Sequence, residues 1–188
     1  KKYQLADWYT AVQSLKAPDK PTTSHVIADY LVFILFTGLR FSEAAELRWD
    51  FVDLQDQTIT IADPKNRQYF VLPLTAFLIN LLKERQIMAV NEFVFPGREG
   101  KGHLIEPRKQ MAHVTKISGI EFTVHDLRRT FATIAESLDI PFSTIKRLIK
   151  HKIGNDVTEG YIVSDVERLR RPMEQISELL TQTIKPMN

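Results

Sequence analysis

The stretch FTVHDLRRTFATIAESL at residues 122–138 combines a helical core pattern with a cationic front end. His125, Arg128 and Arg129 lie about one helical turn apart, beside an apolar stripe at helical spacing. The free backbone N–H groups at the start of a helix already attract anions, and these side chains add positive charge there. The stretch therefore predicts an anion site at the start of this helix.

A further arginine, Arg40, is expected to be held by a rigid backbone. It follows the apolar run FILFTGL, in which Gly38 should end a buried helix. Glu43, three residues later, can brace the guanidinium, and a braced guanidinium meets its partner in a fixed orientation. Taken alone, this segment favours an ordinary structural Arg–Glu pair at a helix start.

A metal-dependent reaction is the alternative interpretation of the same residues. His125 followed by Asp126 resembles the paired ligands of metal-dependent HD-type phosphohydrolases, with His103 or His113 as possible upstream ligands. Such a site needs several converging carboxylates, whereas Asp126 is already expected to form a capping box with Thr123. The sequence also contains no phosphate-binding Walker loop, no G-x-S-x-G elbow and no H-E-x-x-H helix.

Composition restricts the class of protein. A chain of 188 residues that is 44% hydrophobic and 26% charged is globular and large enough for one domain with its own core. The absence of cysteine excludes a disulfide scaffold and suits a reducing cytoplasm. The longest apolar run, residues 30–36, is far shorter than the roughly 20 residues of a membrane helix. A net charge of +2 does not by itself indicate a nucleic-acid partner.

The order of predicted elements is helices, then a short sheet, then helices. Residues 57–62 and 69–74 alternate as two paired strands joined by a polar turn. Ser42 is expected to cap one helix, and Thr123 another. The predicted fold is mainly α (α+β), with a small antiparallel β-sheet. Helices are predicted over residues 3–16, 22–36, 42–47, 74–88, 107–118, 122–138, 141–150 and 164–180.

The last predicted helix carries one apolar stripe. SDVE at 164–167 is a good capping box, and Pro172 is expected to kink the helix. The stripe has two interpretations: it covers its own domain, or it docks on a neighbouring subunit. Its members are Val166, Leu169, Met173, Ile176 and Leu180.

The segments TGLRFSEAAEL, HDLRRTFAT, LIKHK and EGYI, in this order, resemble the catalytic domain of tyrosine recombinases, the phage-integrase family. The resemblance runs from about residue 24 to residue 162. It implies a catalytic domain over residues 1–163, a C-terminal helical tail over 164–188, and upstream DNA-binding domains that are not part of this chain. The catalytic residues it implies are Arg40, Lys65, His125, Arg128, His151 and Tyr161.

The resemblance also implies a reaction. Tyr161 would attack a DNA phosphodiester, Arg40 and Arg128 would stabilise the charged transition state, and Lys65 would protonate the leaving 5′ oxygen. His125 or His151 would donate to the phosphate or assist deprotonation of the tyrosine. No cofactor, metal or nucleotide is expected, and the expected partners are double-stranded DNA and a homo-tetramer assembled on it. A type IB topoisomerase and a DNA-binding module without catalysis are the alternatives, beside the phosphohydrolase.

Overall fold

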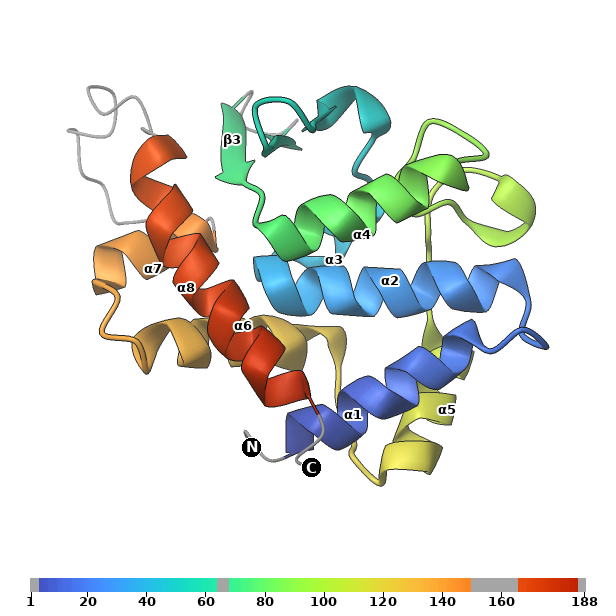
Figure 1. The fold of residues 1–188 in the computed structure, drawn as a ribbon. Helices are drawn as coiled ribbons and strands as arrows, with labels where there is room; N and C mark the ends of the chain where they lie inside the picture. Colours follow the sequence, from blue (N-terminus) through green and yellow to red (C-terminus); the bar gives the residue numbers. More distant parts are fainter. Residues whose placement is uncertain (1–3, 64–67, 150–165, 186–188) are drawn as a thin grey trace.

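The computed structural model describes residues 4–63, 68–149 and 166–185. These residues form a helical domain with a three-stranded sheet at one end (Figure 1). The predicted mainly α fold with a small antiparallel sheet is therefore confirmed. The helices are α1 (Gln4–Gln13), α2 (Thr22–Thr37), α3 (Phe41–Ala45), α4 (Ala76–Ile87), α5 (Arg108–Ser118), α6 (Val124–Glu136), α7 (Phe142–Leu148) and α8 (Val166–Ile184), with short 3₁₀ turns at Ser14–Lys16, Trp49–Phe51 and Arg98–Gly100.

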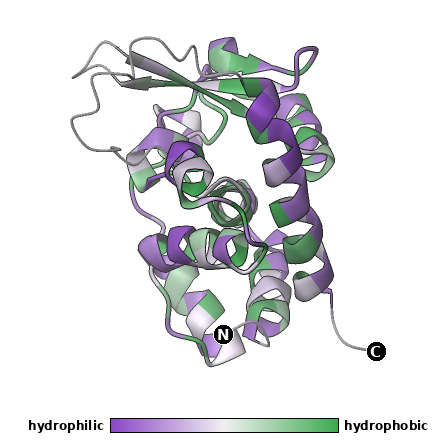
Figure 2. Cartoon of the chain, turned by 90° about the vertical axis from the view of Figure 1, so that its left-hand side faces the viewer, coloured by the Kyte–Doolittle hydropathy of each residue, from purple (hydrophilic) through white to green (hydrophobic). Residues whose placement is uncertain are grey.

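Helix α2 forms the centre of the core. Every residue from Val26 to Thr37 is buried, as expected for a helix that is apolar on nearly all sides. It packs against α1, α4, α6 and α8. Figure 1 shows α2 between α4 and α1, and the end-on view of Figure 2 places it at the centre of the surrounding helices. None of the helices described is both long and apolar enough to cross a membrane.

Gly38 ends α2, as the sequence predicts. Its φ angle is +65°, and its N–H donates to the carbonyl of Ile34 at 2.9 Å. The predicted cap at Ser42 is wrong, because α3 begins at Phe41 with Arg40 in the N-cap position, and α3 ends at Ala45. The reason is that the Glu43 carboxylate binds the backbone N–H of Arg40 at 2.8 Å, which starts the helix before the serine.

Replacing Gly38 by alanine should destabilise the domain more than the same change at Gly119. Both glycines have a left-handed φ, which costs alanine about 1–2 kcal/mol. A Cβ at Gly38 would also lie 2.6 Å from the Phe131 ring, whereas one at Gly119 would meet nothing within 4 Å. Overpacking should add about 1–3 kcal/mol to the cost of Gly38→Ala. Chemical unfolding of both variants measures this difference in the free energy of unfolding. An equal loss of stability in the two variants would contradict the close contact between Gly38 and the Phe131 ring.

The sheet contains β1 (Val52–Asp53), β2 (Thr58–Asp63) and β3 (Gln68–Pro73) in that order, all antiparallel. The predicted pairing of the two longer strands is confirmed, and its register places Ile59 opposite Leu72, both fully buried. Strand β1 was not predicted, because two residues are too short to show an alternating pattern.

Helix α8 packs on its own domain, against α1, α2, β3, α6 and α7. Its apolar stripe is therefore covered within the chain, which is the first of the two interpretations above. Pro172 lies inside a helix that continues on both sides of it. The predicted cap at 164–165 lies outside the described residues. The buried residues of α8 are Leu169, Met173, Ile176, Ser177, Leu180 and Ile184.

Candidate active site

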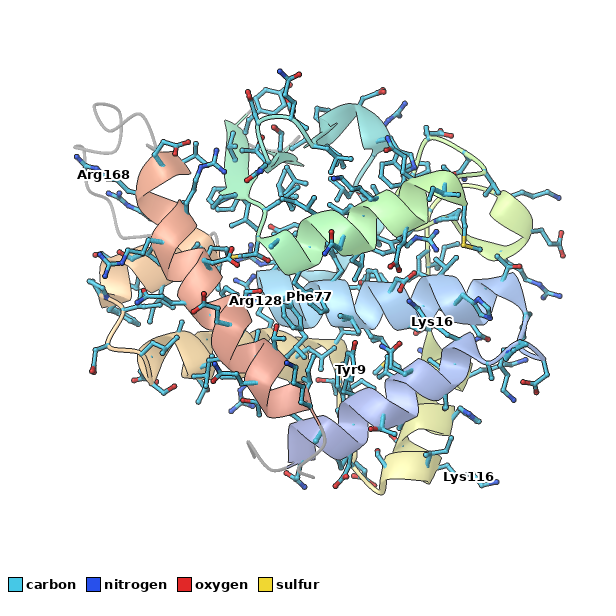
Figure 3. The ribbon with its side chains drawn as sticks, in the orientation of Figure 1. Tyr9, Lys16, Phe77, Lys116, Arg128 and Arg168 are labelled. Carbon is cyan, nitrogen blue, oxygen red and sulfur yellow. The ribbon has the colours of Figure 1, made fainter. Side chains whose placement is uncertain are left out.

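Arg128 joins two helix ends near the centre of the molecule. Its side chain extends from α6, and the residue is only 7% exposed. One guanidinium nitrogen, Nη1, donates to the carbonyl of Gly38, and the other, Nη2, donates to the carbonyl of Ile149, both at 2.5 Å. These carbonyls lie at the C-terminal ends of α2 and α7, where the helix dipole favours a cation. Figure 3 shows Arg128 beside this end of α2. The guanidinium is thus held in one place by the backbone.

The charge of Arg128 is largely buried, with the residue only 7% exposed. Burial lowers the pKa of Arg128, the nearby Arg40 lowers it further, and Glu43 acts in the opposite direction. Arg40 follows Gly38, whose carbonyl binds Arg128, by two positions, so these two arginines, 88 positions apart in the sequence, lie in one region where their like charges repel each other. A bound anion would relieve this repulsion, so the pair is suited to hold negative charge.

Arg40 is more accessible than Arg128, with its side chain 47% exposed. Its Nη1 donates to Oε1 of Glu43 at 2.9 Å, while its backbone N–H donates to Oε2 of the same carboxylate. The prediction that Glu43 braces Arg40 is confirmed by these contacts. Because one carboxylate fixes both the backbone and the guanidinium, Arg40 keeps a defined orientation while it remains open to solvent.

His125 lies in the exposed first turn of α6, three residues before Arg128. This spacing places both side chains on one side of the helix. The start of α6 is fixed by a capping box, as predicted: the N–H of Thr123 donates to Asp126 Oδ2 at 2.9 Å, and the N–H of Asp126 donates to Thr123 Oγ1 at 3.2 Å. His125 thus lies on the same side of α6 as Arg128, at the N-terminal end of the helix.

The structure gives Asp126 the role of a helix cap. The side-chain and backbone hydrogen bonds from Thr123 lower the pKa of this carboxyl group. His103 packs on the ring of Phe93, and its Nδ1 lies 3.0 Å from the carbonyl of Leu104. Within residues 4–63, 68–149 and 166–185, no group of three or more His, Asp or Glu side chains is placed to hold a metal ion.

Three of the predicted site residues, Lys65, His151 and Tyr161, lie outside the described residues. The structure does describe the segments on either side of them. Strands β2 and β3 flank Lys65, Ile149 precedes His151 by two positions, and α8 begins after Tyr161.

The two backbone carbonyls that hold Arg128 were not predicted. Gly38 and Ile149 lie 90 and 21 residues away in the sequence, and a carbonyl oxygen is present at every position. No side-chain pattern could therefore identify them before the fold was known.

Comparison with known proteins places the chain in a family. The model of the Phage integrase family matches residues 9–168. Prophage integrase IntF of Escherichia coli (strain K12) is 31% identical over 181 residues, which cover 93% of this chain and 37% of IntF. The chain thus spans little more than a third of that relative.

Solved structures show the same fold. The XerH site-specific recombinase bound to its difH substrate in a pre-cleavage complex matches with a TM-score of 0.64 and 24% identity, over 78% of this chain and 45% of XerH. A lambda integrase tetramer bound to a Holliday junction matches with a TM-score of 0.59 and 19% identity, over 80% of this chain and 45% of that chain. By the match to the family model and the similarity to IntF, this chain belongs to the phage integrase family.

Proposed function

We propose that this chain is the catalytic part of a site-specific DNA recombinase, or integrase, which cleaves and rejoins DNA through a 3′-phosphotyrosine at Tyr161. The observation that carries the proposal is the arginine pair. Arg128 is fixed by two carbonyls and Arg40 by Glu43, and both lie at one end of α2 and α6. Membership of the phage integrase family supports the proposal.

The proposed reaction needs positive charge in a fixed position. Attack of the Tyr161 oxygen on phosphorus builds charge on the non-bridging phosphate oxygens, and preorganised donors stabilise it by about 3–4 kcal/mol each. Arg40 and Arg128 provide such donors and stay protonated near neutral pH. The bond from phosphorus to the 5′ oxygen breaks, and that oxygen takes a proton from Lys65.

The two histidines complete the proposed site. His125 and His151 donate to the phosphate or assist deprotonation of Tyr161. The phosphotyrosine keeps the energy of the broken bond, so a free 5′ hydroxyl rejoins the strand in the reverse step without ATP. Residues 1–163 carry this chemistry in the proposal, and residues 164–188 are a C-terminal tail that contains α8.

The proposed partner is double-stranded DNA in the cytoplasm, bound by a homo-tetramer. The related lambda integrase has been solved as a tetramer on a Holliday junction, and XerH has been solved with its DNA substrate. The basic stretch at 146–152 should follow the phosphate backbone, with a contribution that is independent of sequence and sensitive to salt. A catalytically silent DNA-binding module and a type IB topoisomerase remain the alternatives to test.

Cleavage should persist in excess EDTA, because arginines supply the charge that divalent ions supply in metal-dependent enzymes. The test uses a suicide DNA substrate, in which the short fragment that carries the free 5′ hydroxyl diffuses away after cleavage and leaves the protein attached to the other fragment. Denaturing gels should show the same amount of covalent adduct with and without EDTA. Loss of activity that added metal restores would favour the phosphohydrolase, and absence of any adduct would favour the binding module.

Replacing Arg128 by methionine should lower the cleavage rate about 10²–10³-fold, the usual cost of losing one transition-state donor. Stability should change by no more than about 2 kcal/mol, because two effects oppose each other. The carbonyls of Gly38 and Ile149 lose their donor, but a charge that the fold holds at a lowered pKa is also removed.

Single-turnover cleavage and chemical unfolding measure the two quantities for Arg128→Met separately. Arg129→Met is the control, since Arg129 is exposed on the same helix and its Nη1 lies 3.6 Å from Oδ1 of Asp126. A folded Arg128→Met protein that cleaves at the wild-type rate would contradict the role of Arg128.

A further inference from the structure

We propose that Arg170 is a positioning residue for the nucleophile: it fixes the start of α8 on the sheet, and thereby the end of the segment that carries Tyr161. The inference rests on the proposed function, because it assigns Arg170 a task in the tyrosine reaction. Within the described residues, Arg170 makes its hydrogen bonds to Glu167, Asp56 and Gln57, and not to the site residues described above.

Arg170 uses all three nitrogens of its guanidinium. Nε donates to the Glu167 carboxylate at 2.8 and 2.9 Å, Nη2 donates to the carbonyl of Asp56 at 2.9 Å, and Nη1 donates to the carbonyl of Gln57 at 3.2 Å. The pKa of Arg170 is raised, chiefly by its hydrogen bonds to Glu167. A planar group held on three sides has one orientation, so the N-terminal part of α8 is attached to the turn between β1 and β2.

The turn that receives Arg170 is itself held in place. The Asp53 carboxylate accepts the N–H groups of Gln55 and Asp56 at 2.9 and 2.8 Å. The Gln57 carbonyl also accepts the N–H of Leu74, just after β3, at 2.8 Å, and Gln57 has a left-handed φ of +55°. A non-glycine residue keeps this backbone conformation only where its surroundings determine it. Arg170 therefore holds α8 to a defined point on the sheet.

The chain length connects this contact to the nucleophile. Val166, the first residue of α8, follows Tyr161 by five positions, so at most about 17 Å of extended chain separate them. At the other side of the segment, the Ile149 carbonyl is held by Arg128. Arginine-to-carbonyl contacts thus fix the described chain both before and after Tyr161. Because a shift of about 1 Å costs an in-line reaction up to about 10²-fold, the contact after Tyr161 should affect the rate.

Arg171 provides a matched control. It is the neighbouring residue, carries the same charge and is exposed, and it makes no hydrogen bond or ion pair with the part of the chain that the structure describes. Arg170→Ala and Arg171→Ala therefore change the net charge equally, and they differ in the loss of the contacts to Glu167, Asp56 and Gln57.

The experiment measures the single-turnover rate of adduct formation on the suicide substrate, with DNA affinity and thermal midpoint measured for each variant. Arg170→Ala should form adduct about tenfold more slowly or worse, while Arg171→Ala stays within about twofold of wild type. DNA affinity of the two variants should agree within about twofold. Arg170→Lys keeps the charge but cannot reach Glu167 and both carbonyls together, so its rate of adduct formation should be intermediate. This variant replaces Arg170→Ala in the comparison if the alanine variant is unfolded at the assay temperature.

The Arg170→Ala defect could arise from a misplaced tyrosine or from a change in the sheet that displaces Lys65. A second substrate distinguishes these two causes. Sulfur in place of the bridging 5′ oxygen leaves as a thiolate and needs no general acid. The Arg170→Ala defect should remain on this substrate. The inference would be overturned if the Arg170→Ala defect disappeared on this substrate. It would also be overturned by equal rates for Arg170→Ala and Arg171→Ala, or by a wild-type rate in folded Arg170→Lys. Failure of the wild-type chain to form adduct would instead refute the proposed function.

Discussion

The Tyr161→Phe variant should form no detectable covalent adduct with DNA, while its DNA affinity stays within about twofold of wild type. The change removes a single oxygen, the nucleophile, and leaves Arg40, Arg128 and the basic surface in place. Gel separation of adduct and a binding titration at one fixed salt concentration measure the two quantities.

The other tyrosines of the described chain supply the control. Tyr30 is fully buried and its hydroxyl donates to the carbonyl of Phe41 at 3.0 Å, and burial raises its pKa, so it is unsuited to attack DNA. Burial also raises the pKa of Tyr9, and Asp29 raises it further. Tyr69 on β3 is 69% exposed and is the better candidate for an alternative nucleophile. Tyr69→Phe should keep full adduct formation, and loss of adduct in this variant alone would contradict the role of Tyr161.

Removal of residues 164–188 should abolish the cooperative unfolding transition. Helix α8 buries five large apolar side chains, each contributing about 1.5–3 kcal/mol, against a total stability of about 5–15 kcal/mol for a typical domain. Without them, α1, α6 and β3 would expose apolar surface to water. Circular dichroism during heating measures the loss, and exposure of the core should also cause aggregation.

A smaller change of the same helix tests the same packing without deleting chain. Leu180→Ala, at a fully buried position, should cost about 2–5 kcal/mol, and Glu178→Ala, on the exposed face, should cost less than about 0.5 kcal/mol. A truncated protein that stays folded as a monomer and loses only its assembly on paired DNA sites would instead show that α8 serves mainly as a contact between subunits.

Elements with strong local signals could be predicted from the sequence. The apolar run of α2, Gly38 at its end and the Thr123–Asp126 capping box each depend on residues within one or two helical turns. The start of α3 could not be predicted from Ser42, because the backbone of Arg40 and the carboxylate of Glu43 compete successfully for the cap. Local residue types indicate that a helix starts, but the groups that compete to cap its first N–H groups determine the residue at which it starts.

The brace of Arg40 by Glu43 was predicted from the sequence, whereas the backbone contacts that hold Arg128 were not. Arg40 and Arg128 were identified from the order of the motifs, which also implied that they act together. The carbonyls of Gly38 and Ile149, and the contact of Arg170 with the β1–β2 turn, depend on residues brought together by the fold from 21 to 114 positions apart. Backbone atoms carry no sequence signal, so contacts of this kind become visible only in the structure.

Mass spectrometry of the trapped adduct tests the central claim most directly. The wild-type chain is reacted with a suicide substrate in EDTA, digested with a protease and a nuclease, and the peptide that carries the nucleotide is sequenced. The account predicts one modified peptide, with the phosphate on the oxygen of Tyr161. A nucleotide attached to any other residue, or a substrate cleaved without any attached peptide, would contradict it.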